Sequence, residues 1–259
     1  MRTVQATRYV TPLREGGSLP AIIEADDSGL YVLKFRGAGQ GPLALVAELV
    51  AGLMGRALGL PVPELVLVEL DAALGRNEPD QEIQDLLRAS AGLNIAMDYL
   101  PGSVTFDAAA GDRPAPDLAS RIIWFDALIT NIDRTPRNPN LLMWHRQLYL
   151  IDHGAALYFH HQWERLDEKA LSPFAPICQH VLLPWASQLA QADEELRPLL
   201  APALLAQILE LIPESWLTRP GVEATASQIR AAYLAYFEQR LAAASIFLAE
   251  AQRARAQLI

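Results

Sequence analysis

Short apolar and polar patterns typical of strands fill much of the first 100 residues, and helical patterns fill most of the rest. Residues 1–36 predict strands separated by a Gly-rich turn at 16–17 and an Asp-Asp-Ser-Gly hairpin turn at 26–29. Residues 42–60 predict a buried helix, because apolar side chains form a wide stripe (positions 45, 46, 49, 50, 53, 54, 57 and 58) behind a leading proline.

The pattern changes near residue 101, from mostly β with one main helix to mostly α. Residues 103–117 contain few apolar side chains and predict a loop, and the chain after them predicts helices interrupted by one short hairpin. The further elements expected are strands at 61–70 and 93–100, a helix at 79–90 and the hairpin at 140–151. We therefore expect an α+β protein with a β-rich part, residues 1–101, and a helical part, residues 102–259.

The composition is that of a globular protein, with 51% hydrophobic and 20% charged residues in a chain of 259. A net charge of -9 argues against direct binding of nucleic acid, because no basic stripe is present. The most apolar window, residues 43–68, is interrupted by charges and prolines, so we expect no membrane span. Cys178 is the single cysteine, which excludes an internal disulfide and a cysteine-based zinc site and fits a cytoplasmic location.

Polar side chains that suit phosphoryl transfer gather in the stretch from 131 to 154. Asp133 is followed five residues later by Asn138, in a loop stiffened by two prolines, and Asp152 stands at the far end of the expected hairpin, before Gly154. Carboxylate and amide oxygens bind Mg²⁺, and a carboxylate can orient an attacking hydroxyl. The alternative for each residue alone is an Asx turn that caps the hairpin.

The N-terminal half offers groups that could hold a nucleotide. Of the 21 basic residues only Lys34 and Lys169 are lysines, and Lys34 lies in the apolar strand sequence YVLKF. A lysine there suits a phosphate in a tight cleft, or simply extends from an edge strand into solvent. Glu48 lies in the apolar stripe of the expected helix, where it would need a partner such as Lys34 unless it faces solvent. Gly16 and Gly17 form a turn whose backbone could approach phosphate, or an ordinary hairpin turn.

The order of these parts is that of a protein-kinase-like fold: Gly-rich turn, strand lysine, helix glutamate, further strand, Asp-x-x-x-x-Asn and Asp-x-Gly. The stretches NIDRTPRNPNLL, LIDHGAAL and VAELVAGLMGRALGLPVPELVLVEL resemble the HipA-like kinases, a bacterial Ser/Thr kinase family related to the phosphatidylinositol 3/4-kinase branch. The resemblance spans roughly residues 10–160. It implies a two-lobed fold, with a small antiparallel-sheet N-lobe (1–101) and a mainly helical C-lobe (102–259).

The resemblance also implies roles for single residues. Asp133 would be the catalytic base, and Asn138 and Asp152 would be the Mg²⁺ ligands. Lys34 would contact the phosphates of ATP, with Glu48 positioning it. The remaining nucleotide contacts would come from the hinge residues Met97, Asp98 and Tyr99 and from the turn residues Gly16, Gly17 and Ser18. Ser18 is also near a position where some members are autophosphorylated, but the sequence favours the alternative that it is a simple turn serine.

The implied cofactors are therefore ATP and Mg²⁺, and the implied acceptor is a protein Ser/Thr hydroxyl. The chain is shorter than the full-length toxin kinases of the family, so a toxin role does not follow from the resemblance. Two alternatives use the same parts: a nucleotide-binding pseudokinase that acts through a partner, and a kinase for a small alcohol or an aminoglycoside-like molecule.

Overall fold

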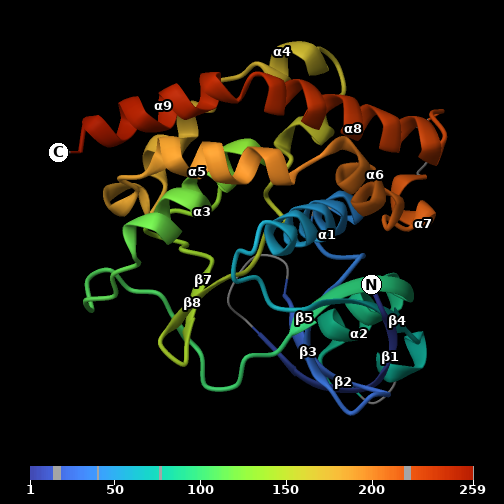
Figure 1. The fold of residues 1–259 in the computed structure, drawn as a ribbon. Coiled ribbons are helices and arrows are strands. Elements are labelled where there is room, and N and C mark those ends of the chain that lie inside the picture. The colour runs from blue at the N-terminus through green and yellow to red at the C-terminus, as the bar shows by residue number, and fades with distance from the viewer. Residues whose placement is uncertain (14–18, 40, 76–77, 219–222, 259) are drawn as a thin grey trace.

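The computed structural model describes residues 1–13, 19–39, 41–75, 78–218 and 223–258. Within these ranges the chain forms a five-stranded barrel, a separate three-stranded sheet, and helices that fill most of the C-terminal half. In Figure 1 the barrel lies at one end of the molecule and the helices of the C-terminal half lie at the other, with helix α1 (Pro42–Ala57) between them.

The barrel has the strand order β1-β2-β3-β5-β4, and a parallel pairing of β1 with β4 closes it. All its other neighbouring strands are antiparallel, so the antiparallel sheet expected here is present, but one parallel pair closes it into a barrel, which was not expected. The strands are β1 (Thr3–Pro12), β2 (Ala21–Ala25), β3 (Leu30–Lys34), β4 (Leu65–Leu70) and β5 (Gly92–Asp98). The expected turn after β2 is an Asx turn, in which Asp27 Oδ1 accepts the Gly29 amide at 2.9 Å.

The barrel encloses its own small hydrophobic cluster, which includes Ile23, Leu33 and Val68. Helix α2 (Gln81–Ala89) adds Ile83 and Leu87 to this cluster. The helix begins where the Asp80 side chain accepts the Glu82 amide at 3.0 Å, a standard N-cap.

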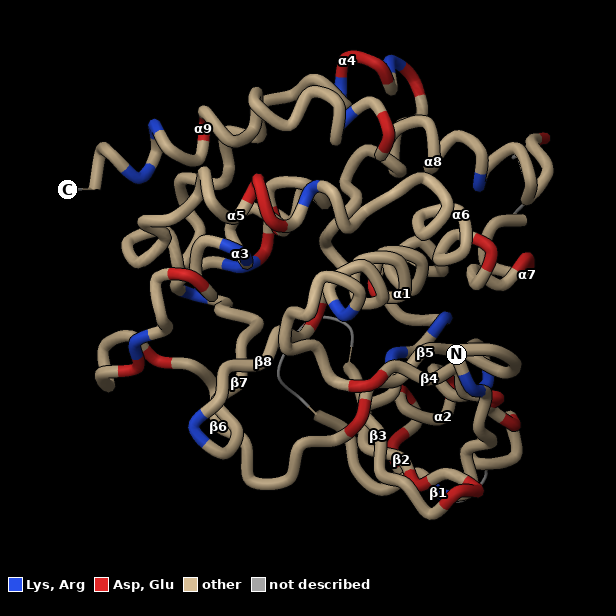
Figure 2. The backbone as a smooth tube through the Cα atoms, viewed as in Figure 1, with Lys and Arg blue, Asp and Glu red and all other residues tan. Residues whose placement is uncertain are grey.

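Helix α1 is apolar along almost its whole length, and Figure 2 draws it nearly all tan. Most of its buried apolar residues belong to the larger hydrophobic cluster that the C-terminal helices share, and α1 also contacts β4 and β5. Gly52 permits the close approach to β4, because a Cβ at this position would lie 2.4 Å from Leu65 Cδ1. The packing of α1 fixes the place of Glu48, whose side chain is 1% exposed.

The C-terminal half starts with the small sheet β6-β7-β8, whose strands are all antiparallel. Its strands are β6 (Val104–Thr105), β7 (Leu141–Trp144) and β8 (Gln147–Leu150). The α-helices are α3 (Pro116–Leu128), α4 (Leu166–Ala170), α5 (Leu189–Leu196), α6 (Pro202–Glu210), α7 (Glu214–Leu217), α8 (Ala226–Ala242) and α9 (Ala244–Ala256). Short 3₁₀ helices occur at Ala72–Gly75, Tyr158–His161, Ala175–Gln179, Leu183–Trp185 and Arg197–Leu199.

The expected elements occur, with two differences. The strand expected at 61–70 begins at Leu65, because Pro61 and Pro63 lack the N–H that a ladder needs. The loop expected at 103–117 contains β6, which pairs with β7, so the prediction was wrong there. A two-residue strand has no alternation to detect, and its partner lies far along the chain. Among the described residues, the helices are too short or too polar to cross a membrane.

Candidate active site

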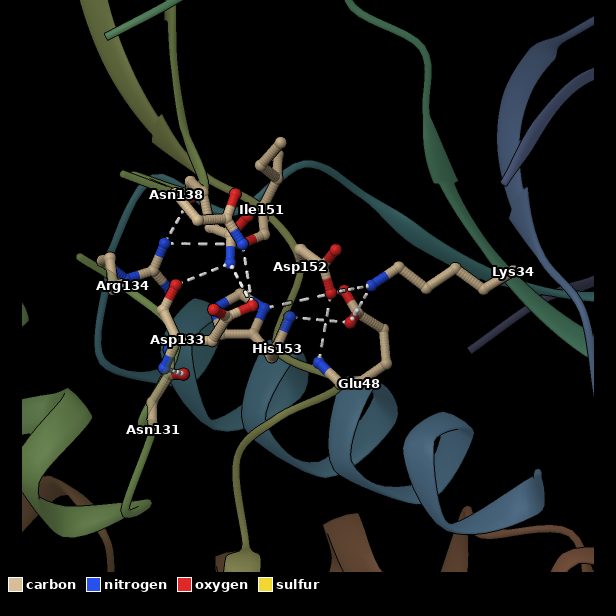
Figure 3. Close-up of polar contacts among 11 residues, drawn as sticks. Lys34, Glu48, Asn131, Asp133, Arg134, Asn138, Ile151, Asp152 and His153 are labelled. Atoms are coloured by element: carbon tan, nitrogen blue, oxygen red, sulfur yellow. Dashed lines mark hydrogen bonds and ion pairs between the residues drawn. The ribbon is translucent and has the colours of Figure 1, made fainter. Parts of the chain in front are cut away.

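The end of β3 and the middle of α1 bring Lys34 and Glu48 together. Lys34 is the last residue of β3, and its Nζ lies 2.6 Å from Glu48 Oε2. The same nitrogen lies 2.5 Å from Oδ1 of Asp152, which follows β8 (Figure 3). The contact expected from the sequence is therefore present, and a third side chain joins it.

Both members of the buried pair are charged. Burial favours the neutral form of Lys34, but the carboxylates of Asp152 and Glu48 outweigh it and raise the pKa of Lys34 above its usual range. Burial also opposes the charge on Glu48, yet the Lys34 ammonium and the His153 side chain lower the pKa of Glu48 to about 2. The backbone N–H of His153 also donates to Glu48 Oε2 at 2.7 Å. Asp152 differs from both, because its side chain is 41% exposed.

The loop after α3 presents Asp133 with one oxygen held and the other open. Asp133 Oδ2 accepts the side-chain amides of Asn138 at 2.8 Å and Asn140 at 3.2 Å. Asn140 also donates to the Asp133 carbonyl at 3.0 Å, and Asn131 Oδ1 accepts the Asp133 amide at 3.2 Å. Asp133 Oδ1 has no hydrogen-bond partner among the described residues. All three asparagines of this stretch thus hold the aspartate in place.

Two residues of the site have left-handed backbone conformations, with φ of 48° at Asn140 and 53° at Asp152. Asn and Asp tolerate this region better than most residues. The Asn140 carbonyl accepts the Ile151 amide at 3.1 Å, so the end of the Asp133 loop and the end of β8 are tied together. The hairpin between them therefore brings Asn138 and Asp152 to one place.

A buried ionic cluster made by Asp126, Arg134 and His180 lies behind the loop. Asp126, on α3, accepts Arg134 Nε at 2.6 Å and His180 Nε2 at 2.8 Å on the same oxygen. Its other oxygen accepts the side-chain amide of Asn131 at 3.1 Å. Burial opposes the charge on Asp126, but Arg134 and His180 outweigh it and lower the pKa of Asp126 below its usual range. The Asp126 and Arg134 side chains are both 0% exposed.

A cavity of about 600 Å³ lies between the barrel, the small sheet and the loop. This volume is typical of a small-molecule site. Lys34 and Asp152 line one part of it, with Asn138 and Asn140 beside them. The expected hinge residues Met97, Asp98 and Tyr99 line another part, together with Leu100.

The hinge backbone is partly engaged in the barrel. The amides of Asp98 and Tyr99 donate to the carbonyls of Glu64 at 2.8 Å and Leu30 at 3.0 Å. The Leu100 amide, in contrast, donates to no group in the described part of the chain. The backbone N–H of Leu100 is therefore available to donate a hydrogen bond to a ligand in the cavity.

The donor set beside Lys34 fits a hard cation. Asn138 Oδ1 and Asp152 Oδ2 line the same cavity and have no hydrogen-bond donors among the residues that the structure describes. The described residues contain no group of three or more His, Cys, Asp or Glu side chains that could hold one metal ion. One carboxylate and one amide suffice for Mg²⁺, because this ion usually takes its other ligands from phosphates and water.

The structure thus joins Lys34 to Glu48 and Asp152. It also brings Asp133 into contact with Asn138, which lines the same cavity as Lys34 and Asp152, whereas Asp133 itself is not a lining residue. The expected phosphate-binding residues Gly16, Gly17 and Ser18 lie outside the described residues.

Sequence reasoning missed Asp126, His153 and His180. Asp126 carried a usable signal, since it is the only charged residue in the apolar run IIWFDALI, the same argument that singled out Glu48. His180 carried none, because its partner lies 54 residues away in the sequence.

Comparisons with known proteins show the family and the fold of the chain. Residues 7–243 match the family described as HipA-like kinase. The chain belongs to the HipA-like kinase family. A proinflammatory kinase of Helicobacter pylori, CtkA, has a similar fold, with a TM-score of 0.56, 14% identity, and coverage of 99% of this chain and 98% of that one.

The Golgi casein kinase with Mn and ADP bound is also similar, with a TM-score of 0.51, 12% identity, and coverage of 95% of this chain and 73% of that one. At these identities the two structures show a kinase-like fold for the HipA-like chain and no more. A search of curated proteins gave no match.

Proposed function

We propose that this HipA-like protein is an ATP- and Mg²⁺-dependent kinase that phosphorylates a protein Ser or Thr hydroxyl. One observation carries the proposal: Lys34 joins Glu48 of α1 to Asp152 at a cavity that Asn138 also lines. A lysine, an opposed carboxylate and an open carboxylate–amide pair are the parts that phosphoryl transfer from ATP requires. The two residue ranges 1–101 and 102–259 serve as the two lobes, and α1, which belongs to the first range, packs against α6 and α7 of the second.

In this proposal the nucleotide lies in the 600 Å³ cavity. The Leu100 amide donates to the adenine ring, beside Met97, Asp98 and Tyr99. Lys34 binds phosphate oxygens, and Glu48 keeps its ammonium in place.

Asn138 Oδ1 and the Asp152 carboxylate hold the magnesium ion, which when bound neutralises charge on the phosphate oxygens. Asp133 acts as general base through Oδ1, the oxygen without a partner, while Asn138 and Asn140 hold Oδ2. The acceptor hydroxyl gives its proton to Asp133, its oxygen bonds to the γ-phosphorus, and ADP leaves.

Transfer of labelled γ-phosphate tests the proposal. Wild type, Asp133→Asn and the control Asp85→Asn, an exposed aspartate on α2, are incubated with labelled ATP and Mg²⁺. One arm contains cell-extract proteins and the other contains small alcohols and an aminoglycoside.

We expect labelled protein with wild type and Asp85→Asn, and a rate about 10²–10⁴-fold lower with Asp133→Asn. Undiminished transfer by Asp133→Asn would refute the role of this aspartate. Labelling of the small alcohols alone would replace the protein acceptor, and nucleotide binding without any transfer would indicate a pseudokinase.

A further inference from the structure

We propose that the buried cluster of Asp126, Arg134 and His180 sets the spacing between Asn138 and Asp152, and thereby governs the affinity of the site for Mg²⁺. The inference rests on the proposed kinase function and assigns positioning roles to residues that do not touch the nucleotide cavity. Arg134 of this cluster contacts both chain segments that carry the two ligands, and Figure 3 shows it beside Asn138 and Ile151.

Arg134 connects the two segments through their backbone. Its Nη1 donates to the carbonyl of Asn140 and to that of Ile151, the latter at 3.3 Å. Asn140 follows Asn138 by two residues, and Ile151 directly precedes Asp152. One guanidinium therefore holds both backbone stretches from which the proposed ligands extend. Arg134 uses Nε for Asp126 and Nη1 for the two carbonyls, and a lysine ammonium does not reproduce this arrangement of two donor nitrogens in one plane.

Asp126 fixes the guanidinium from the opposite side. Its Oδ2 accepts Arg134 Nε at 2.6 Å, so α3 supplies the anchor for the whole arrangement. The backbone contributes as well, since the Arg134 carbonyl accepts the Val181 amide at 3.0 Å. The position of Arg134 is thus set from α3 and from the segment near residue 180.

His180 completes the anchor as a neutral donor. The Leu182 amide donates to His180 Nδ1 at 3.0 Å, so Nδ1 carries a lone pair and the proton lies on Nε2. Nε2 donates this proton to Asp126 Oδ2 at 2.8 Å. Burial lowers the pKa of His180 and keeps the ring neutral. Asp126 therefore gains a second fixed donor without a second positive charge beside Arg134.

A purely structural role explains the cluster less well. Three buried polar side chains cost desolvation energy that apolar residues of similar size would not. Arg134 Nη2 is buried and has no hydrogen-bond partner in the described structure, which adds to this cost. The cost is understandable where several atoms must be held at fixed positions for a ligand.

Arg240 supplies a matched control elsewhere in the molecule. This arginine on α8 is also fully buried and donates only to backbone carbonyls, those of Ala127, Leu128, Ala170 and Ser172. None of these four residues belongs to the proposed site. Arg240→Lys therefore damages a buried arginine network of similar size without touching the segments of Asn138 and Asp152.

Calorimetric titration with a non-hydrolysable ATP analogue, with and without Mg²⁺, tests the inference. The dissociation constant without Mg²⁺ divided by that with Mg²⁺ gives the metal-dependent gain in nucleotide affinity. We expect Asp126→Asn and Arg134→Lys to reduce this gain about 10–100-fold, the usual effect of losing support behind a metal ligand. The affinity measured without Mg²⁺ should stay at the wild-type value. His180→Gln keeps a hydrogen-bond donor to Asp126 and should retain the metal-dependent gain in affinity. His180→Leu removes that donor but leaves Asp126 and Arg134 in place, and it should reduce the gain.

Each outcome decides the matter. An unchanged gain in Asp126→Asn, Arg134→Lys and His180→Leu overturns the inference and leaves the kinase proposal standing. A loss in Arg240→Lys as large as that in Arg134→Lys also overturns it, because general loss of stability would then be the cause. A wild type that binds the nucleotide equally well with and without Mg²⁺ overturns the inference and the proposed function together.

Discussion

Two ionic clusters support the candidate site, and they differ in how far their side chains are exposed. In the first, Lys34 pairs with buried Glu48 and with Asp152, whose side chain is 41% exposed. In the second, the side chains of Asp126 and Arg134 are 0% exposed and that of His180 is 2% exposed. The first cluster can exchange its partners for ligands, because one carboxylate already faces the cavity. The second cluster cannot exchange its partners, because its side chains are buried, and it is therefore suited to holding the backbone in place.

The largest effect should follow from breaking the closed cluster. Arg134→Leu leaves the Asp126 carboxylate buried beside a neutral histidine, with no cation to balance it. We expect a loss of about 3–5 kcal/mol in the free energy of unfolding, the usual cost of removing one partner of a buried pair. Urea denaturation followed by circular dichroism measures it. A loss no larger than that of a surface mutation would show that the cluster contributes little to stability.

Breaking the open cluster should cost less. Lys34→Met leaves Glu48 buried, but the His153 amide still donates to it and Asp152 can turn to solvent. We expect a loss of about 2–3 kcal/mol, below that of Arg134→Leu. Nucleotide affinity should fall as well, since the proposed phosphate contact is removed. Urea denaturation and nucleotide titration of one preparation give both values, and a larger loss than in Arg134→Leu would reverse the comparison.

The clusters should also respond to acid in different pH ranges. The folded-state pKa of His180 is lowered, so the unfolded chain binds its proton first, and the stability from His180 is lost as the pH falls below about 6.5. The folded-state pKa of Glu48 is lowered from 4.5 to about 2, so its contribution is complete above 4.5 and lost between 4.5 and about 2.

Melting temperatures measured across these ranges separate the two groups. His180→Gln should remove the decline that starts near 6.5, and Glu48→Gln should reduce the decline below 4.5, to which Asp126 also contributes because its pKa is lowered as well. A decline that persists unchanged in the matching variant would assign it to another residue.

The smallest loss of stability is expected at an exposed ion pair, which gives a reference value for the two clusters. Arg8 and Glu24 form a salt bridge between β1 and β2 with side chains 67% and 36% exposed. Arg8→Ala should change the free energy of unfolding by no more than about 1 kcal/mol, and 0.5 M salt should remove most of that change. A value near that of Lys34→Met would mean that burial does not set the ranking.

The sequence predicted the open cluster better than the closed one, for a physical reason. Lys34 and Glu48 each stand out as a charge inside an apolar pattern, and their order along the chain matches the kinase-like arrangement. Asp126 stands out in the same way, but its partner His180 follows 54 residues later, in a segment without a distinctive pattern. The strand β6 was missed because two residues cannot show alternation, and only pairing with β7 makes them a strand.

The most direct measurement is a crystal structure grown with a non-hydrolysable ATP analogue and Mn²⁺, in which anomalous scattering locates the metal. We predict the nucleotide in the cavity lined by Lys34 and Leu100, with the metal coordinated by Asn138 Oδ1 and the Asp152 carboxylate. Asp133 should stand beside the γ-phosphate with Oδ1 open to the acceptor side. A metal bound elsewhere, or a nucleotide outside this cavity, would contradict the account.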